Sequence, residues 1–422
     1  MRVLWFCSTF FPEACKSLGF PLYVKCGWMS SLGHALAKTE NIELGVAVPS
    51  TEVPYNKITF SNSTHYVIPL DKNTAAFELT IQPSTSLIDD CIKIINDFKP
   101  DIIHIHGTEY FYGLIPLLSN ISMPSVISLQ GLIGPYSRYY FGSMSMSEII
   151  KCHSVYGLIR KFGLIFEYRL WQRRAKVTEN EIIRGNNNFI GRTLWDFAHL
   201  KSINPKANYY HCDEIIREPF YNVRWNINSC HRFSIFASTA SYPLKGFHWL
   251  IKAVALVRRY FPMVTLRVAD ANFHSLTRWN SYNNYLNYLI RSLGLIDCVF
   301  PLGQLTAEKM AEELTSANVF VIPSLIENSP NSLAEAMIVG TPTVSSFVGG
   351  IPSMVCNNET SLCFPPGDER VMAECINMIL EDDDLANRLS ENARVVAINR
   401  HLESGIVSKM IYIYGDVLEC NK

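Results

Sequence analysis

The sequence predicts an α/β protein made of two doubly wound domains, and three observations support this fold class. Short apolar runs alternate with amphipathic stretches along most of the chain, a pattern that favours parallel sheets covered by helices. The length of 422 residues exceeds what one hydrophobic core usually supports, so two domains of about 200 residues are expected. Polar or glycine-rich turns follow several apolar runs, at the strand ends where α/β proteins bind ligands.

The composition argues against several other classes of protein. A net charge of −1 is not that of a general nucleic-acid binder, and a hydrophobic content of 48% is not that of a disordered chain. The 12 cysteines include no CxxC pair and no His/Cys cluster at zinc spacing, so we expect neither a disulfide framework nor a metal site. Apolar runs are too short for a signal peptide or a membrane span. We therefore expect a cytoplasmic protein, peripheral to a membrane at most, without a cofactor.

The first half reads as alternating strands and helices. Strands are predicted over 3–7, 42–48, 66–70, 100–107, 126–129, 188–191 and 208–212, and the clearest helix, over 86–98, has one apolar face. His106 and Gln130 follow two of these strands at their carboxyl ends. Of the alternating His104 and His106, one is expected to pack inside the sheet, so His106 is either a site residue or a core residue.

Residues 151–176 form the most basic region of the chain, with seven Lys/Arg against the single Glu167 and several aromatic residues between them. A basic amphipathic helix of this kind can lie on an anionic membrane surface. The alternative is a helix of a soluble protein with its apolar side inward and its charges in water.

The second half begins after a linker within 221–230. A strand over 233–237 leads to a loop with Lys245, and a helix with a clear apolar stripe follows. A lone cation at a helix start is disfavoured by the helix dipole unless an anion is near, so Lys245 indicates an anion site. Further strands are predicted over 264–269, before Asp270, over 299–302, before Gly303, and over 318–323.

The stretch 323–352 is the most informative part of the sequence. Glu327 and Glu335 lie on either side of a polar turn, residues 328–331, that ends a strand and opens a helix. A helix start offers unpaired N–H groups to phosphate oxygens, and a carboxylate accepts hydrogen bonds from sugar hydroxyls, so this turn suits a nucleotide sugar. Ser332 and Glu335 also fit a capping box, which would make Glu335 structural.

This stretch resembles the donor-site signature of the retaining glycosyltransferases of family 4, the group 1 family with the GT-B fold. Their pattern is Glu, seven residues, Glu, then Ala-Met, Gly-Thr-Pro-Val and Gly-Gly-Ile-Pro, and here only the Val is replaced, by Thr343. The resemblance implies two Rossmann-like domains with parallel sheets that face a central cleft. It assigns 1–220, with a returning helix over 405–422, to the acceptor domain and 221–404 to the donor domain.

The resemblance also implies roles for individual residues. Lys245 and Glu327 would act on the donor's diphosphate and on the transferred sugar, and Glu335 would bind the ribose. The remaining donor-binding candidates are Asn328, Ser329, Pro330, Asn331, Ser332, Gly27 and Gly303, and the candidate acceptor or cleft residues are His106, Gln130, Arg192 and Arg217. Gly27 could equally be a turn glycine, and Arg192 and Arg217 could be surface ion-pair residues.

The chain departs from the family pattern at three of these places. Ala240 stands where relatives carry a phosphate-binding Arg, and Gln130 stands where many carry His. Gln can exchange hydrogen bonds with a sugar but cannot exchange a proton as His does. Asp270 replaces a frequent Gly, so the loop after that strand is expected to be shaped differently. The acidic run 381–384 is interpreted as a solvated turn and helix cap, not a metal-binding motif.

The resemblance implies a retaining, metal-independent glycosyltransferase that moves a hexose from a nucleotide-diphosphate sugar to a glycan or lipid-linked acceptor, in surface polysaccharide biosynthesis. Alternatives are a sugar-nucleotide epimerase or phosphorylase of the same fold and, because of Ala240 and Gln130, a non-catalytic sugar-nucleotide-binding protein.

Overall fold

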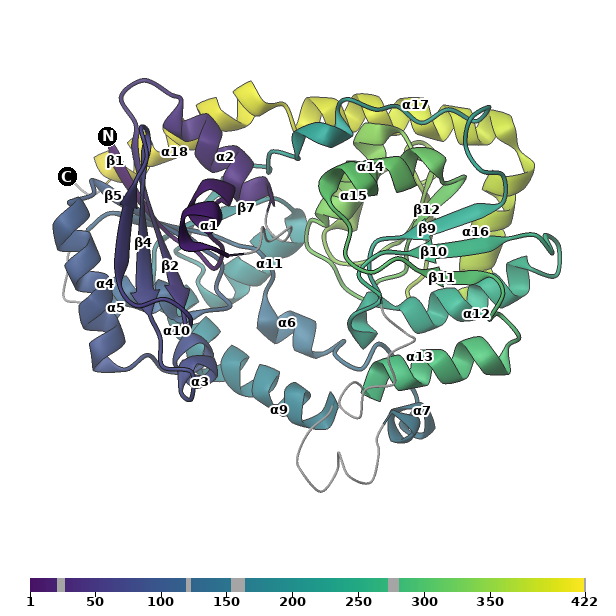
Figure 1. Ribbon diagram of the computed structural model, residues 1–422, viewed down its shortest axis with the longest axis horizontal. Coiled ribbons are helices and arrows are strands. Elements are labelled where there is room, and N and C mark those ends of the chain that lie inside the picture. The colour runs from purple at the N-terminus through teal and green to yellow at the C-terminus, as the bar shows by residue number, and fades with distance from the viewer. Residues whose placement is uncertain (21–26, 119–122, 153–163, 272–280, 421–422) are drawn as a thin grey trace. The chain divides into compact units, whose positions relative to one another are not determined.

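The computed structural model describes residues 1–20, 27–118, 123–152, 164–271 and 281–420, which form two compact units (Figure 1). Unit 1 comprises Met1–Pro135, Trp171–Ile215 and His401–Lys422. Unit 2 comprises Tyr136–Leu170 and Ile216–Arg400. Each unit contains one sheet with helices on both faces, so the predicted α/β class is confirmed.

Unit 1 is organised on an eight-stranded sheet with the order β3-β4-β2-β1-β5-β6-β7-β8. All neighbouring strands are parallel except β3 and β4, which form an antiparallel edge that the sequence did not indicate. The strands are β1 (Arg2–Phe6), β2 (Glu43–Ser50), β3 (Asn56–Thr59), β4 (Ser63–Pro69), β5 (Ile102–His106), β6 (Ser125–Ser128), β7 (Asn188–Gly191) and β8 (Asn208–His211).

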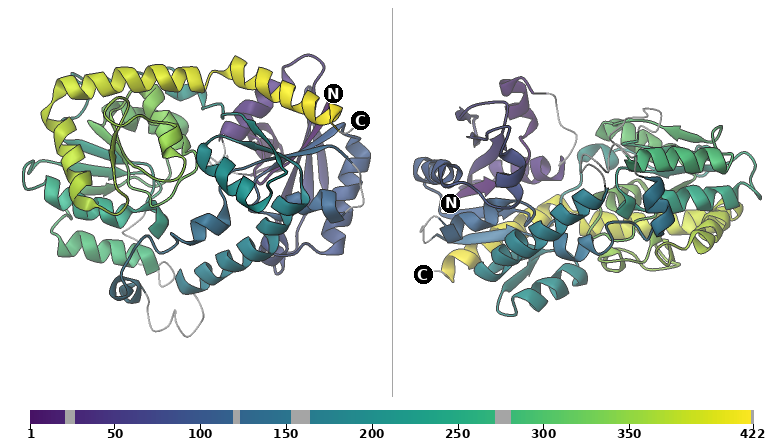
Figure 2. Two further views of the ribbon diagram at one scale, coloured as in Figure 1. Left: turned by 180° about the vertical axis from the view of Figure 1, so that it is seen from behind. Right: turned by 90° about the horizontal axis from the view of Figure 1, so that it is seen from below.

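Two apolar layers cover this sheet. One contains α4 (Thr85–Phe98), α5 (Ile115–Leu118), α10 (Asn180–Gly185) and α11 (Leu194–Ile203), and α3 (Ala75–Thr80) adjoins it. The other contains α1 (Pro12–Leu18), α2 (Gly27–Ala37) and the C-terminal α18 (Glu403–Glu419), which lies against α2 (Figure 2). Helix α4 illustrates the local cause: Ser84 accepts the N–H of Leu87 as its cap, and the apolar stripe predicted for this segment packs into the core.

Unit 2 contains a fully parallel six-stranded sheet with the order β11-β10-β9-β12-β13-β14. Its strands are β9 (Ser234–Ala237), β10 (Thr265–Val268), β11 (Val299–Pro301), β12 (Val319–Ile322), β13 (Thr343–Ser346) and β14 (Leu362–Phe364). Figure 1 shows α12 (Phe247–Val257) and α13 (Ser281–Ser292) on one side of the sheet, and α14 (Ala307–Ser316) and α15 (Asn331–Val339) on the other. Helices α16 (Glu369–Glu381) and α17 (Asp383–Arg400) complete the unit.

Residues 136–170, which the sequence analysis assigned to the first domain, belong to unit 2. The carbonyl of Gly142 accepts hydrogen bonds from His248 and Trp249 on α12. Glu148, on α7 (Met146–Lys151), pairs with Lys252 of α12 at 2.9 Å. These contacts join segments far apart in the sequence, which explains why a domain boundary drawn from sequence pattern alone did not assign residues 136–170 to unit 2.

The basic region 151–176 is not one helix. Lys151 ends α7, residues 153–163 lie outside the described residues, and α9 spans Leu164–Arg174. A π-helical turn, Ala175–Glu179, follows α9 directly.

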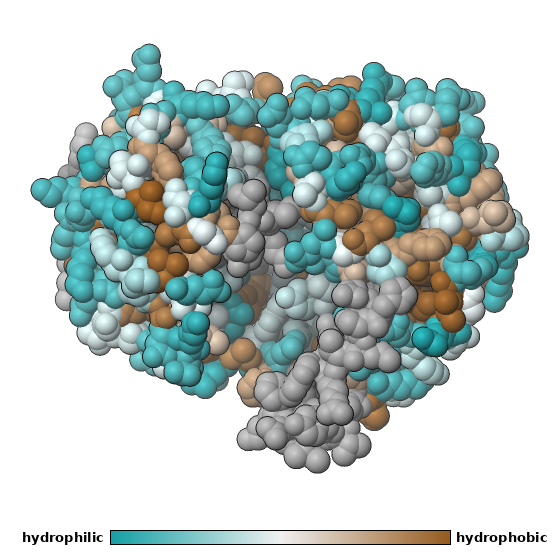
Figure 3. All heavy atoms as spheres, in the orientation of Figure 1, coloured by the Kyte–Doolittle hydropathy of each residue, from teal (hydrophilic) through white to brown (hydrophobic). Residues whose placement is uncertain are grey.

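The face of the molecule in Figure 3 carries mainly hydrophilic side chains with scattered apolar ones. In the described part of the chain, no helix combines the length and the apolar character that crossing a bilayer requires.

The interpretation of the acidic run 381–384 as a solvated turn and helix cap is confirmed. The carboxylate of Asp382 accepts the N–H of Leu385 at the start of α17, and Asp383 forms an exposed ion pair with Arg232. The described residues contain no group of three or more His, Cys, Asp or Glu side chains arranged to hold a metal ion.

Candidate functional site

The polar residues of unit 2 gather where the strand order reverses. Strand β9 lies between β10 and β12, so the connections that leave β9 and β12 diverge at their carboxyl ends. In open parallel sheets this reversal creates the crevice that binds ligands. Lys245 follows β9 and Glu327 follows β12, which places both predicted residues at this point.

Lys245 and Glu327 form an ion pair, with 2.7 Å between Nζ and Oε1. Ser324 donates a second hydrogen bond to the same oxygen, also at 2.7 Å. The Glu327 side chain is 8% exposed and that of Lys245 is 27% exposed, so the carboxylate is buried while the ammonium group keeps access to solvent. The anion that the sequence analysis expected near Lys245 is therefore the carboxylate of Glu327 in this structure. Sequence reasoning did not identify Ser324 as the second partner of this carboxylate.

Two glycines allow the loops around this pair to approach closely. Gly246 has φ +69°, and a Cβ there would lie 1.9 Å from the carbonyl oxygen of Pro323. Gly349 has φ +53°, and its Cβ would lie 1.9 Å from the carbonyl oxygen of Glu327. The next residue, Gly350, donates its N–H to that same oxygen at 2.9 Å. A side chain at either glycine would push the loops apart, so the backbone positions of residues 323–327 depend on both.

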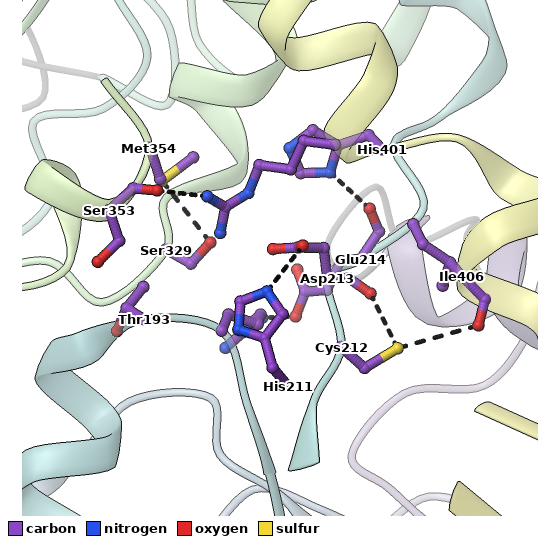
Figure 4. A network of polar contacts seen from close by, with 12 residues as sticks. Thr193, His211, Cys212, Asp213, Glu214, Ser329, Ser353, Met354, His401 and Ile406 are labelled. Atoms are coloured by element: carbon purple, nitrogen blue, oxygen red, sulfur yellow. Dashed lines mark hydrogen bonds and ion pairs between the residues drawn. The ribbon is translucent and has the colours of Figure 1, made fainter. Parts of the chain in front are cut away.

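Helix α15 opens directly after the polar turn, but not as a capping box. Its N-cap is Pro330, which provides no side-chain cap, so the interpretation of Ser332 and Glu335 as a reciprocal cap was wrong. The first backbone donors into Pro330 are the N–H groups of Leu333 and Ala334. The N–H groups of Asn331 and Ser332 precede them and point out of the helix start, as the first N–H groups of any helix do. Asn328 is buried, and Ser329 contacts the Met354 sulfur at 3.7 Å (Figure 4).

Glu335 pairs with Arg217, with 2.6 Å between Oε1 and a guanidinium nitrogen. Burial raises the pKa of Glu335 above its ordinary value, and the charge and hydrogen bond of Arg217 oppose that rise. Arg217 also lies over the ring of Phe220, with 5.0 Å to the centroid. Arg217 thus lies in unit 2 beside Glu335, the residue predicted to bind the ribose. The alternative of a surface ion pair is wrong, because Glu335 is only 5% exposed.

Two of the departures from the family pattern, Ala240 and Asp270, lie in unit 2, as does the donor-binding candidate Gly303. Ala240 is buried, and the neighbouring hydroxyls of Thr239 and Ser241 bond each other at 3.0 Å. Asp270 has φ +47°, a left-handed conformation that usually favours glycine. Asp270 thus adopts the backbone conformation that glycine favours. The loop whose shape was expected to differ, residues 272–280, lies outside the described residues. Gly303 has φ +68°, and its carbonyl accepts the N–H of Asp270 at 2.7 Å.

The predicted residues of unit 1 lie at the ends of β5, β6 and β7. His106 is buried against the rings of Trp5 and His104, at centroid distances of 4.4 and 4.0 Å. Burial, followed by the neighbouring His104 and Arg192, places the pKa of His106 well below its ordinary value, so the imidazole is neutral. Both alternating histidines are buried, not one. Gly27 is the first residue of α2, and its carbonyl accepts hydrogen bonds from Ser30 and Ser31.

Arg192 is a buried cation that follows β7 and contacts residues just after β6 and β8. It forms an ion pair with the equally buried Glu214, so the surface ion pair considered from sequence is wrong. The same guanidinium donates to the carbonyls of Leu129 at 2.6 Å and Gln130 at 3.0 Å. The Glu214 carbonyl accepts a hydrogen bond from His401 at 2.7 Å (Figure 4). Arg192 and Glu214 line a small cavity together with Trp28, Ser128, Gln130 and Asp213.

The structure thus brings together Lys245 with Glu327 and Arg217 with Glu335 in unit 2, and Gln130 with Arg192 in unit 1. Sequence reasoning missed the pairings of Arg192 with Glu214 and of Arg217 with Glu335, because no local pattern reveals which of these residues meet. It also missed Ser324, which lies only three residues before its partner Glu327.

Comparison with known proteins adds a family and a fold. Residues 221–396 match the family model of the glycosyl transferases group 1. An MMP α-(1→4)-mannosyltransferase from Mycolicibacterium hassiacum is 30% identical over 182 residues, which cover 43% of this chain and 42% of that protein. The match therefore spans less than half of the length of this curated relative.

Solved structures resemble the chain over nearly its whole length. Sucrose-phosphate synthase from Thermosynechococcus elongatus aligns with a TM-score of 0.73 at 17% identity over 99% of each chain. A protein from Anabaena, solved in complex with UDP and glucose, aligns with a TM-score of 0.67 at 14% identity, over 99% of this chain and 100% of that one. At these identities the likeness concerns the fold.

Proposed function

Residues 221–396 match the glycosyl transferases group 1 family and the chain has the GT-B fold, and from this premise we propose that it is a retaining, metal-independent hexosyltransferase that uses a nucleotide-diphosphate sugar. The observation that carries the proposal is the Lys245–Glu327 pair at the carboxyl ends of β9 and β12, next to the start of α15. A cation, a helix start and a buried carboxylate are the groups that a diphosphate joined to a sugar requires.

Binding of the donor would redistribute the Lys245–Glu327 pair. In the structure each group satisfies the other at 2.7 Å. A diphosphate near Lys245 would compete for the ammonium group, with the N–H groups of Asn331 and Ser332 sharing the phosphate charge. Glu327 would then accept hydrogen bonds from hydroxyls of the transferred hexose. Positive groups fixed before the reaction stabilise the leaving diphosphate as its charge develops.

Glu335 would hold the ribose of the same donor. One of its oxygens is bound by Arg217, and the other has no hydrogen bond among the described residues. The charge of Arg217 opposes the effect of burial on the Glu335 pKa and so favours the carboxylate form, which accepts from two adjacent ribose hydroxyls. Arg217 thereby takes part in donor binding through Glu335 and not as an acceptor contact.

The proton of the acceptor hydroxyl would pass to the leaving phosphate oxygen, with attack from the same face that the diphosphate leaves. Two features of unit 1 support a mechanism without a side-chain base. His106 is buried with a strongly lowered pKa, and Gln130 stands where a histidine would be available to exchange protons. His106 and Gln130 are therefore proposed as neutral contacts or packing residues around the acceptor.

We further propose a glycan or lipid-linked acceptor in surface polysaccharide biosynthesis, with the protein at the inner face of the membrane. Ile165 and Phe166, on the first turn of α9, are 36% and 49% exposed. Arg169 and Arg173 follow on the same helix and are exposed. An aromatic side chain beside exposed arginines fits an anionic headgroup layer.

A thermal-shift panel of nucleotide sugars tests donor binding, because a ligand that binds only the folded state raises its melting temperature. NMR of the product then distinguishes the candidate activities. A linkage that keeps the donor's anomeric configuration supports retaining transfer. A free, altered sugar nucleotide or a sugar phosphate would instead show an epimerase or a phosphorylase, and binding without turnover on any acceptor would show a non-catalytic protein.

A further inference from the structure

Charged side chains bind five backbone polar groups in the segment after β6, residues 129–134, which leads into the short helix α6 (Ile133–Ser137). Arg192 binds the carbonyls of Leu129 and Gln130. Glu109 accepts the N–H of Gly131 at 3.1 Å. Glu179 accepts the N–H groups of Ile133 and Gly134, each at 2.7 Å, through its two different oxygens. Three buried or half-buried charged side chains thus bind the backbone of five of these six residues.

Glu179 has an unusual origin and environment. It ends the π-helical turn Ala175–Glu179, a rare geometry that occurs often at functional sites. The side chain is 1% exposed and also accepts a hydrogen bond from the Thr108 hydroxyl at 3.2 Å. Its turn is itself anchored, because Thr178 donates to the carbonyls of Thr80 and Ile81, both at 2.9 Å.

Two charged groups act on Glu179 from the elements packed against it. Glu109, from the segment after β5, disfavours a second negative charge, and Arg174, at the end of α9, favours it. Burial is the largest effect and raises the pKa of Glu179 to about 7, against the opposing hydrogen bonds from Gly134, Ile133 and Thr108. The loop from α3 contributes backbone carbonyls that bind Thr178, not a charged group.

We propose that Glu179 is a positioning residue of the transfer reaction, whose carboxylate fixes residues 130–134 so that Gln130 is held ready for the acceptor. The inference rests on the proposed function, because it assigns Gln130 to an acceptor contact. Gln130 lies two residues after the end of β6, and its carbonyl is bound by Arg192. The Glu179 contacts at Ile133 and Gly134 restrain the same segment on the C-terminal side of Gln130. Misplacement of a reactant by about 1 Å can cost on the order of 100-fold in rate.

Protonation of Glu179 converts one acceptor oxygen into a hydroxyl, which no longer suits an N–H that points at it. The clamp on Ile133 and Gly134 therefore weakens as the pH falls through about 7. Glu179→Gln makes a similar change permanently, because its NH₂ group must face one of the two backbone donors.

The test compares the full-length wild type, Glu179→Gln and Asn186→Ala. Asn186 is a matched control: its side chain is equally buried in unit 1 and donates to the carbonyls of Gly113 and Ile182 at 2.9 Å, away from residues 129–134. Amide hydrogen exchange of a peptide covering 129–136, UDP binding by calorimetry, and kcat/KM for transfer between pH 5.5 and 8.5 are measured for all three.

We expect Glu179→Gln to raise exchange in this peptide about tenfold, to lower kcat/KM by on the order of 10- to 100-fold and to leave UDP affinity unchanged. We also expect the wild-type profile to lose activity below about pH 7, and the variant to lack that dependence. Exchange equal to that of Asn186→Ala, or transfer that survives faster exchange, would overturn the proposal. Absence of transfer by the wild type would refute the proposed function, while the exchange measurement still decides whether Glu179 holds the loop.

Discussion

Replacement of Lys245 by alanine tests the proposed donor site most directly, because the structure separates its effect on stability from its effect on function. The variant leaves the Glu327 side chain, which is 8% exposed, with only the hydrogen bond from Ser324 among the described residues. Breaking a buried ion pair costs about 3–5 kcal/mol and losing an exposed one about 0–1 kcal/mol. Since the Lys245 side chain is 27% exposed, we expect a loss of about 1–2 kcal/mol in the free energy of unfolding.

The expected functional loss is larger. Removal of one preorganised positive group from a developing charge typically lowers kcat by about 10²–10³, or 3–4 kcal/mol. We therefore expect Lys245→Ala to remain folded, to bind UDP more weakly and to lose most transfer activity. Glu327→Ala should also lose transfer, but with a smaller effect on UDP affinity, because its proposed partner is the sugar.

Lys252→Ala is the matched control for Lys245→Ala. Lys252 pairs with Glu148 at 2.9 Å in the same unit, with side chains 23% and 18% exposed, and has no role in the proposed site. Urea unfolding, UDP calorimetry and transfer kinetics are compared for both variants. If Lys245→Ala matches Lys252→Ala in UDP affinity and transfer, or if Lys245→Ala and Glu327→Ala both keep full activity, the assignment of the donor site is wrong.

Three further predictions concern other parts of the chain. Arg217→Ala should weaken UDP binding by about tenfold, because the variant favours the protonated form of Glu335. UDP affinity measured by calorimetry should therefore recover as the pH is raised. A UDP affinity that is the same in wild type and variant at every pH would contradict the assignment of Glu335 to the ribose. Gly349→Ala should lower the free energy of unfolding by about 2 kcal/mol or more, as measured by urea unfolding. The cause is that Gly349 has φ +53° and that a Cβ there would lie 1.9 Å from a carbonyl oxygen. A variant as stable as the wild type would disprove this close approach. Phe166→Ser should lower the fraction of protein that sediments with vesicles containing anionic lipid, but not the fraction that sediments with neutral vesicles. Equal sedimentation of wild type and variant would argue against a membrane role for α9.

The pH dependence of stability provides an independent check on Glu179. Its pKa in the folded protein, about 7, lies above the ordinary value of 4.5, so the folded state binds the proton more tightly than the unfolded state does. Its contribution therefore favours folding below about pH 4.5, declines as the pH rises and is fully lost above about pH 7. A difference of about 2.5 pKa units corresponds to about 3 kcal/mol. Urea unfolding of wild type and Glu179→Gln across this window should differ in slope, and parallel curves would show that Glu179 titrates normally.

The sequence by itself determined the architecture and the chemical character of the site. Alternating apolar and amphipathic segments specify parallel sheets because each pattern buries one kind of surface, and both units have such sheets. The placement of Glu327 and Lys245 after two strands was predictable, because carboxyl ends of parallel strands meet at one edge, and their proposed roles came from the resemblance to family 4. The acidic run at Asp382 was predictable because helix capping is a local interaction.

Only the tertiary structure decided which charges meet. Arg192 and Arg217 looked alike in sequence, yet one pairs with Glu214 inside unit 1 and the other with Glu335 in unit 2. The capping box at Glu335 fitted its local pattern and is absent, because the helix begins at Asn331 and the carboxylate turns to Arg217. Glu179 gave no signal in sequence, since its partners are backbone N–H groups of a distant loop. Local patterns determine elements and their ends, whereas pairing between distant buried charges depends on how packing brings those elements together.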